Sequence, residues 1–278
     1  MTDNNKKILD EVKGIVSEKK VITKKNIKDS IHSDEEKLIK KEIDKWINEN
    51  AEEVAKNIPH EKMKEMGWNS HVWVIDGGSS DETKIVSQEN KFHFIPQQGK
   101  GKGAAMRLGF TKFLESDNNV LVMLDSDGTY DAREIPSFLD KLSTYDVVIG
   151  DRLNGDINPD AMTRLNYFGN HILTWMATGM YGITINDLCS GYWGFTKNAV
   201  SRLKLNSMKF EIEAEMYTSC VKEELEIKNI PISYSSRIGQ AKLGSVSDGW
   251  RIFRKLIVRR IFGTPIEAKI GKGNLDIE

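Results

Sequence analysis

The chain has 278 residues, and 40 lysines and arginines nearly balance 41 aspartates and glutamates, which excludes a polycation that coats nucleic acid, so no nucleic-acid partner is expected. Hydrophobic residues make up 39% of the chain, enough for the core of one large domain or two small ones. Two widely spaced cysteines, Cys189 and Cys220, argue against a disulfide scaffold. The sequence shows no apolar run of transmembrane length and no signal peptide. We therefore expect a soluble or peripheral protein in a reducing compartment.

Residues 1–69 differ from the rest of the chain in composition. They contain no arginine, and apolar residues recur at helical spacing, as in Leu38, Ile43 and Ile47. Ser33 stands three residues before Glu36, which is the spacing of a capping box. We expect a solvated helical segment that is either a divergent first part of the fold or an extension of it.

Residues 70–245 alternate between short apolar runs and helical stretches. The runs predict strands at 71–75, 91–95, 119–124 and 145–150, and the stretches between them predict helices. This alternation is typical of an α/β fold with a mostly parallel sheet flanked by helices. In such a sheet ligands bind at the carboxyl ends of the strands, and each of the first three predicted strands ends in an unusual loop.

The loops after the first two strands are rich in glycine. Asp76 and Gly77 open the first loop, where a carboxylate can accept hydrogen bonds from a nucleoside, although the pattern alone favours a tight turn. The second loop runs from Gly99 to Gly103 and opens a helix. Its amides and Lys102 can hold an anion, and a flexible basic loop fits the pattern equally well.

The loop after the third strand carries Asp125, Ser126 and Asp127. Two carboxylates at the end of a buried strand can hold Mg²⁺ or Mn²⁺ through oxygen ligands and leave positions open for diphosphate oxygens. A polar turn is the plainer interpretation, but the strand context favours a metal site.

These motifs, in this order, resemble a known family. The segments IDGGSSDET, GKGAAMRLGF and LDSDGTYD are similar to the signature of family-2 inverting glycosyltransferases with the GT-A fold, most of all the dolichyl- and polyprenyl-phosphate sugar synthases. Later segments, among them VVIGDRL, INDLCSGYWGF and KFEIEAEM, extend the resemblance over residues 71 to about 260. It implies transfer of a sugar from a UDP- or GDP-sugar to a dolichyl or polyprenyl phosphate, with Mg²⁺ or Mn²⁺ as cofactor, in protein or surface glycosylation.

The resemblance also implies a role for each matching residue. Positions that bind the nucleotide or its metal-held diphosphate are matched by Asp76, Gly77, Lys102, Asp125, Ser126 and Asp127. Positions that bind phosphate are matched by Arg152, Arg164, Arg237 and Lys242. The catalytic candidates are Asp125, Asp127, Asp187 in the acceptor-side loop, and Glu213. The spacing of Glu211, Glu213 and Glu215 cannot place all three on one helix face, so at most Glu213 is expected to face the site.

The implied reaction needs a cation and basic side chains to stabilise the leaving nucleoside diphosphate. A lipid phosphate is already an anion at neutral pH, so no strong general base is required. Inverting displacement on an α-linked donor gives a β-linked product. The alternative is a sugar or protein hydroxyl acceptor, for which Asp187 or Glu213 could serve as the base.

Two features depart from the family pattern. The strand and acidic turn with which the family begins have no match before Asp76, and Thr129 and Ala241 stand where the family often has glutamine and serine. A relative that binds sugar nucleotides without catalysis is therefore a second alternative.

Residues 246–278 form a basic tail. Within it, residues 250–262 hold five basic residues and no acid. One helical stripe carries Trp250, Phe253, Ile257 and Ile261, and the other side mostly carries Arg251, Arg254, Lys255 and Arg259. We expect an amphipathic helix that either packs on the domain or binds the membrane surface, which would make the protein peripheral on the cytoplasmic face.

Overall fold

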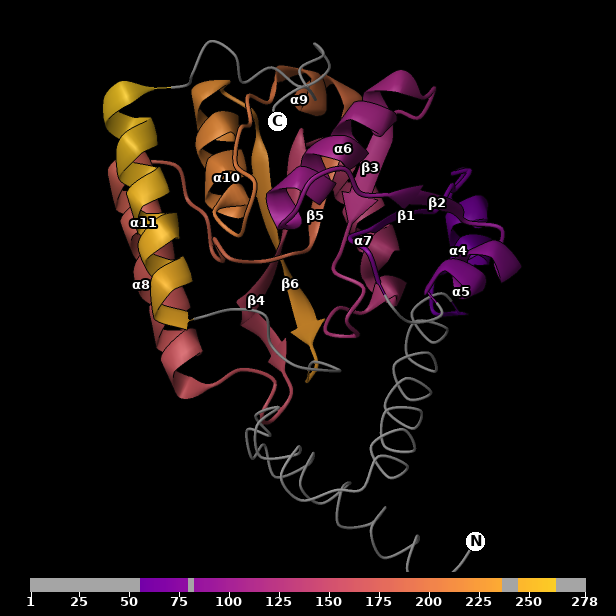
Figure 1. Ribbon diagram of the computed structural model, residues 1–278, viewed down its shortest axis with the longest axis horizontal. Coiled ribbons are helices and arrows are strands. Elements are labelled where there is room, and N and C mark those ends of the chain that lie inside the picture. Colours follow the sequence, from indigo (N-terminus) through magenta and orange to yellow (C-terminus); the bar gives the residue numbers. More distant parts are fainter. Residues whose placement is uncertain (1–55, 80–82, 237–244, 264–278) are drawn as a thin grey trace, which may run out of the picture. The chain divides into compact units, whose positions relative to one another are not determined.

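The computed structural model describes residues 56–79, 83–236 and 245–263 (Figure 1). The chain divides into two compact units, Met1–Lys45 and Trp46–Glu278, and all described residues belong to the second. Most of the helical segment predicted at 1–69 lies outside the described residues, as do the phosphate-binding candidates Arg237 and Lys242.

The second unit contains a parallel strand pair and a four-stranded mixed sheet. The pair consists of β1 (Trp73–Asp76) and β2 (His93–Pro96). The larger sheet has the order β3 (Val120–Met123), β5 (Trp193–Thr196), β4 (Val147–Ile157) and β6 (Ile227–Tyr234). The predicted α/β class is confirmed, but β5 runs antiparallel to both of its neighbours. The sheet is therefore mixed at its centre.

Helices flank the strands (Figure 1). In chain order they are α4 (His60–Glu65), α5 (Thr83–Glu89), α6 (Lys102–Glu115), α7 (Ile135–Leu142) after the 3₁₀ turn η1 (Ala132–Glu134), α8 (Arg164–Tyr181), α9 (Lys197–Arg202), α10 (Ile212–Lys222) and α11 (Ser245–Phe262). Sequence signals set several ends. The hydroxyls of Thr163 and Thr196 cap α8 and α9, and Gly182 ends α8 in the left-handed conformation that glycine adopts without strain.

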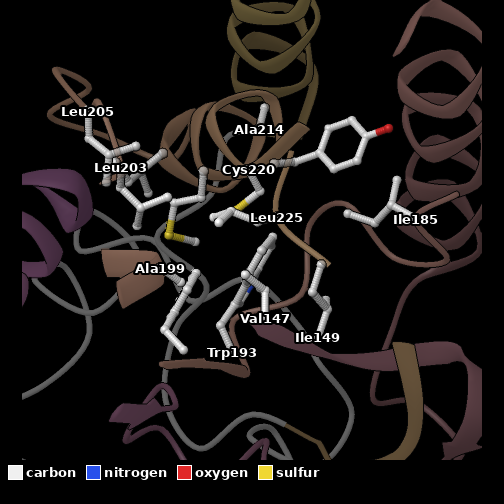
Figure 2. Packing of buried hydrophobic residues seen from close by; sticks show 14 of the residues in the cluster. Val147, Ile149, Ile185, Trp193, Ala199, Leu203, Leu205, Ala214, Cys220 and Leu225 are labelled. Carbon is white, nitrogen blue, oxygen red and sulfur yellow. The ribbon is translucent and has the colours of Figure 1, made fainter. Parts of the chain in front are cut away.

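The core lies on both faces of the mixed sheet. Along β4, Val147 and Ile149 belong to one buried cluster and Val148 to the other, because successive strand residues point to opposite faces. Trp193 and Cys220 pack with Val147 and Ile149 in the first cluster (Figure 2). A strand covered on both faces has an unbroken apolar sequence, which explains the run of apolar residues in β4.

Helix α4 contributes to the second cluster. Its Met63 is buried there, and Ile58 and Trp68 pack against the same cluster. The described part of the lysine-rich N-terminal stretch therefore packs into the core of the second unit. Cys189 and Cys220 are both free thiols, as the sequence indicates.

Helix α11 packs on the domain and also leaves large apolar side chains exposed. Ile252 and Leu256 are buried, whereas Trp250 is 63% and Phe262 is 80% exposed. Arg259, on the basic side of the predicted helix, is buried against α10. Among the described residues, none of the helices combines the length and the apolar character needed to span a membrane.

Candidate active site

The ends of β1 and β2 lie together. The Asp76 carboxylate accepts hydrogen bonds from the amides of Gly78 at 3.0 Å and Ser79 at 3.1 Å, which is the tight turn that the pattern favours. Gln97 follows β2 and joins this turn to the glycine-rich loop. Its amide donates to the Asp76 carbonyl at 2.7 Å, and its side chain donates to the Gly101 carbonyl at 2.9 Å.

The glycines of the second loop allow a close backbone contact. A Cβ atom on Gly101 would lie 2.3 Å from the Met208 carbonyl oxygen, and one on Gly103 would lie 2.4 Å from that of Ser207. Only glycine fits at these two positions. Helix α6 begins at Lys102, two residues before the predicted start, so Lys102 lies in its first turn.

Lys102 bridges two carboxylates from distant parts of the chain. Its Nζ lies 2.8 Å from Asp125 Oδ2 after β3 and 2.8 Å from Glu213 Oε1 in the first turn of α10. Although burial disfavours its charge, Asp125 and Glu213 raise the pKa of Lys102 above its ordinary value. Burial also raises the pKa of Glu213, an effect that Lys102 opposes. Glu213 thus lies beside Lys102, which also contacts Asp125.

The carboxylates after β3 fit a divalent cation. Asp127 Oδ1 accepts from the Thr129 hydroxyl at 2.6 Å, which orients it, and a Cβ atom on Gly191 would lie 2.6 Å from Asp125 Oδ2. Glu213 Oε2 is buried without a hydrogen-bond partner in the described part of the chain. No cluster of three or more histidine, cysteine or acidic side chains suited to a metal occurs among the described residues.

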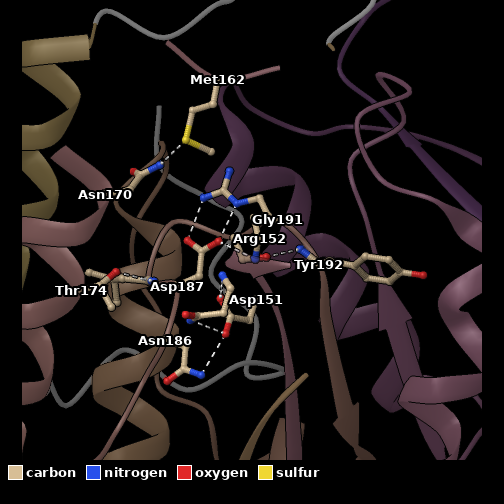
Figure 3. Close-up of polar contacts among 12 residues, drawn as sticks. Asp151, Arg152, Met162, Asn170, Thr174, Asn186, Asp187, Gly191 and Tyr192 are labelled. Atoms are coloured by element: carbon tan, nitrogen blue, oxygen red, sulfur yellow. Dashed lines mark hydrogen bonds and ion pairs between the residues drawn. The ribbon is translucent and has the colours of Figure 1, made fainter. Parts of the chain in front are cut away.

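Arg152 and Asp187 form a buried ion pair (Figure 3). Arg152 is 6% exposed and Asp187 is 0% exposed. The Asp187 carboxylate accepts hydrogen bonds from Arg152 Nε at 2.6 Å, from Nη2 at 2.8 Å and from the Arg152 amide at 3.1 Å. Burial opposes the guanidinium charge, but Asp187 raises the pKa of Arg152 well above its ordinary value.

A β-bulge places Arg152. The pairing of β4 with β6 shifts register between Asp151 and Asp156, and Arg152 lies in this irregular stretch. Bulges re-aim side chains in this way beside many active sites. The Asp151 carboxylate fixes the bulge, accepting from the Asn154 side chain at 2.8 Å and from the Asn186 side chain at 2.9 Å (Figure 3).

Tyr130 connects the two charged clusters. Its hydroxyl accepts a hydrogen bond at 2.6 Å from the amide of Gly191, the residue that approaches Asp125. Its ring meets Tyr234 edge to face at 5.4 Å between centroids, and Tyr234 in turn lies under the Arg152 guanidinium at 5.0 Å. Burial raises the pKa of Tyr130, so its hydroxyl is neutral. The clusters of Asp125 and Arg152 therefore belong to one site.

The comparisons with known proteins assign the chain to a family. The family model described as glycosyl transferase family 2 matches residues 46–204. The chain belongs to glycosyl transferase family 2. Among curated proteins, the chain is 36% identical over 200 residues to glycosyltransferase AglJ of Haloferax volcanii, a match that covers 71% of this chain and 65% of AglJ.

Two further relatives have names that refer to a phosphorylated polyprenol lipid. The dolichyl-phosphate hexose transferase of Haloferax volcanii is 28% identical, over 65% of this chain and 77% of the relative. The polyprenol monophosphomannose synthase of Mycolicibacterium smegmatis is 24% identical, over 62% of this chain and 70% of the relative. The chain spans less than two thirds of AglJ and 45% of Agl6, a low-salt glycan biosynthesis hexosyltransferase of Haloferax volcanii.

Solved structures confirm the GT-A-like fold of the chain. Glucosyl-3-phosphoglycerate synthase of Mycobacterium tuberculosis, crystallised with Mn²⁺, UDP and glucosyl-3-phosphoglycerate, aligns with a TM-score of 0.58. The alignment covers 80% of this chain and 78% of the synthase, at 14% identity. At that identity the likeness shows the fold alone.

Some residues that the sequence predicts for the site lie apart from the two charged clusters. Other features of the site are not predicted by any sequence pattern. Arg164 is exposed at the first residue of α8, and Ser126 is exposed between the two aspartates. Tyr130 is not singled out by any pattern, although it follows the aspartate pair in the segment DSDGTYD. A cavity of about 380 Å³ beside the glycine-rich loop was also not predicted; it is lined by Lys100, Gly101, Lys209, Phe210, Ser247, Asp248 and Arg251.

Proposed function

We propose that this glycosyltransferase transfers a sugar from a UDP- or GDP-sugar to a dolichyl or polyprenyl phosphate. One observation carries the proposal: the aspartate pair after β3, with Lys102 beside it, is joined through Gly191 and Tyr130 to the buried Arg152. A donor diphosphate and an acceptor phosphate both need cationic partners, and this arrangement supplies them next to each other. The names of the relatives AglJ, dolichyl-phosphate hexose transferase and polyprenol monophosphomannose synthase support it.

The donor side is proposed to hold the diphosphate. Asp125 and Asp127 would hold Mg²⁺ or Mn²⁺, which supplies positive charge to the leaving nucleoside diphosphate. Lys102 brings a fixed ammonium to the same place, and Lys100 and Lys209 line the neighbouring cavity. Asp76 and Gly77 at the end of β1 are proposed to contact the nucleoside, since their turn adjoins the glycine-rich loop through Gln97.

The acceptor side is proposed to bind a phosphate through Arg152. The Asp187 carboxylate accepts hydrogen bonds from Arg152 Nε and Nη2. Arg152 Nη1 makes no hydrogen bond to the described part of the chain. The ion pair would thus hold the guanidinium in place and present Nη1 to an incoming phosphate oxygen. That oxygen attacks the anomeric carbon, the bond from this carbon to the diphosphate breaks, and its electron pair leaves with the nucleoside diphosphate. Displacement from the opposite side inverts the anomeric centre.

A hydroxyl acceptor is the weaker candidate. It needs a carboxylate base, and the two candidates for this role are Asp187 and Glu213. The Asp187 carboxylate is fully buried and accepts three hydrogen bonds from Arg152, while Glu213 is paired with Lys102. The Asp187 arrangement does not favour proton transfer from an incoming hydroxyl, whereas a phosphate oxygen needs no base.

We also propose that the protein is peripheral on the cytoplasmic membrane face, where a lipid phosphate is reached. Trp250 on α11 and Trp175 on the neighbouring α8 are 63% and 76% exposed. Exposed apolar side chains beside basic ones favour an interface with anionic lipids. The exposed basic side chains of α11 are Arg251, Arg254 and Arg260.

A donor screen tests the proposal. Purified protein, Mn²⁺, a short polyprenyl phosphate and labelled UDP- or GDP-sugars are mixed, and label is followed into the lipid phase. The proposal predicts lipid-linked label that disappears with EDTA. If no donor yields lipid-linked label while UDP still binds, the non-catalytic alternative leads, unless a sugar or protein hydroxyl accepts the label instead.

A further inference from the structure

Glu215 is a buried carboxylate outside the charged clusters described above. It is 0% exposed and lies two residues beyond Glu213 in α10. Its Oε2 accepts from the backbone amides of Asn206 at 2.9 Å and Ser207 at 2.7 Å. Its Oε1 contacts Lys255 Nζ at 3.2 Å and also Arg259 Nη2. Burial opposes the charge, but Lys255 and Arg259 lower the pKa of Glu215, so it is ionised at neutral pH.

Helix α11 holds the same segment from its other side. Arg259 Nη2 donates to the Lys204 carbonyl at 3.0 Å and to Asn206 Oδ1 at 3.4 Å. Lys255 Nζ donates to Asn206 Oδ1 at 3.3 Å. Residues 204–207 are therefore fixed between α10 and α11, with Glu215 at the centre of the contacts.

The backbone that Glu215 fixes supports the glycine-rich loop. The Ala104 amide donates to the Met208 carbonyl at 3.3 Å. The missing side chains of Gly101 and Gly103 leave room for the carbonyls of Met208 and Ser207. Between these two glycines stands Lys102, which contacts Asp125 and Glu213. A displacement of residues 206–208 would therefore move Lys102.

We infer that Glu215 is a positioning residue for the donor site, acting through residues 206–208 on the glycine-rich loop and Lys102. The inference rests on the proposed function for its effect on the donor. Glu215 has no exposed surface with which to touch a nucleotide, so its effect is indirect. An ionised carboxylate is needed, because a neutral amide would leave the buried Arg259 and the partly buried Lys255 without a counter-charge.

Hydrogen exchange on the full chain tests the inference. The probe is the Ala104 amide and its neighbours in residues 99–108, compared in wild type and in Glu215→Gln. The inference predicts that exchange in this stretch becomes faster by about tenfold or more, since its support is loosened. The matched control is Glu223→Gln, which breaks the ion pair of Glu223 with Lys204 at the end of the same helix. This control should leave residues 99–108 unchanged.

A second variant covers the case in which Glu215→Gln does not fold. Lys255→Gln removes the more exposed of the two cations and keeps the Arg259 contact, so exchange in residues 99–108 should rise by about threefold. Unchanged exchange there in a folded Glu215→Gln, or in Lys255→Gln if the first variant is unfolded, overturns the inference.

Binding of UDP with Mn²⁺, measured by calorimetry, supplies the functional readout. The dissociation constant should rise about tenfold in Glu215→Gln and stay within about twofold of wild type in Glu223→Gln. If wild type itself binds neither UDP nor GDP, the proposed function fails, while the exchange data still decide the role of Glu215.

Discussion

At the residue scale, the site depends on charges that are held in place by their neighbours. Lys102 is partly buried between Asp125 and Glu213, and Arg152 is buried against Asp187. Such pairs are costly to bury and costly to break, because removing one partner leaves an unpaired charge. Their value for the proposed reaction is that the charged groups need not reorganise when a diphosphate or phosphate arrives.

Replacing Asp127 with asparagine tests the metal role. Asp127→Asn removes one of the two carboxylates and retains the size of the side chain, so Mn²⁺-dependent transfer should fall by about 10³-fold or more. Circular dichroism should show unchanged folding. Asp117→Asn, in an exposed position before β3, is the matched control and should retain activity. Equal activity in Asp127→Asn and Asp117→Asn would refute the metal role.

Gly191→Ala tests the close approach to Asp125. The added Cβ would lie 2.6 Å from Asp125 Oδ2, so the carboxylate must shift, and kcat/KM for the donor should drop by about 100-fold. Gly169→Ala, in α8, is the control because its added Cβ meets no atom within 4 Å. If both variants keep wild-type kcat/KM, the position of Asp125 is not critical.

Sequence and structure agree on some of these residues and differ on others. Asp125 and Asp127 are predictable because an apolar run that forms β3 comes shortly before them. The partners of Lys102 are not, since Glu213 is over a hundred positions away and its contact depends on how α10 packs. Tyr130 is equally hidden, because nothing in a DGTYD turn shows that the tyrosine ring points inward between two charged clusters.

At the element scale, α11 packs on the domain and also leaves large apolar side chains exposed. One face packs on the domain through Ile252 and Leu256, and another leaves Trp250 and Phe262 exposed. Periodicity predicts an amphipathic helix, but it cannot distinguish a face that packs from one that stays open. The ion pair of Arg259 with Glu215 shows the same point, because an arginine in the polar stripe is buried by a partner on another helix.

The packed face of α11 should determine stability. Leu256 is fully buried, so Leu256→Ala should lower the free energy of unfolding by about 2–5 kcal/mol. Urea denaturation followed by tryptophan fluorescence measures the change. A loss below about 0.5 kcal/mol, typical of a surface substitution, would contradict the packing of this helix.

The exposed face of α11 should bind membranes. Trp250→Ala should leave the free energy of unfolding within about 0.5 kcal/mol of wild type, because Trp250 is 63% exposed. Flotation with vesicles containing anionic lipid should show weaker binding than wild type. Equal flotation of the two proteins would show that Trp250 is not part of a membrane-binding surface.

The sheet shows a different limit of prediction from the sequence. Each predicted strand of the first half is found within a few residues of its expected position, because apolar runs and turns are local signals. The antiparallel insertion of β5 between β3 and β4 is set by tertiary packing instead. No local pattern in residues 193–196 encodes the direction in which this strand enters the sheet.

At the scale of the whole molecule, the charges make stability depend on pH. The ordinary pKa of a glutamate is 4.5, and that of Glu215 lies below this value in the folded protein. Its stabilising effect is therefore complete above about pH 4.5 and is lost as the pH falls through the folded pKa. Urea denaturation should show wild type more stable than Glu215→Gln by about 3–5 kcal/mol at pH 7.

The same difference should shrink as the solution becomes acidic. Below the folded pKa of Glu215 both proteins carry a neutral group at this position, so their free energies of unfolding should converge. A difference between the two proteins that stays constant from pH 7 into this acid range would show that the charge of Glu215 does not stabilise the fold.

The overall fold and the family can be predicted from the order of the motifs. The arrangement of the charged residues in the site depends on contacts between residues far apart in the sequence. The ends of β1, β2 and β3 are brought together by the α/β topology, and this could be predicted. The joining of α11 to the glycine-rich loop through Glu215 involves residues from four separate segments, and only the packed chain brings them into contact.

The most direct test of the account compares two acceptors that differ only in a phosphate. Wild-type protein, Mn²⁺ and a mixture of labelled UDP- and GDP-sugars are incubated with a polyprenyl phosphate or with the corresponding polyprenol. The account predicts EDTA-sensitive label in the polyprenyl phosphate and none in the polyprenol. Label in the polyprenol, or in neither lipid, would contradict it.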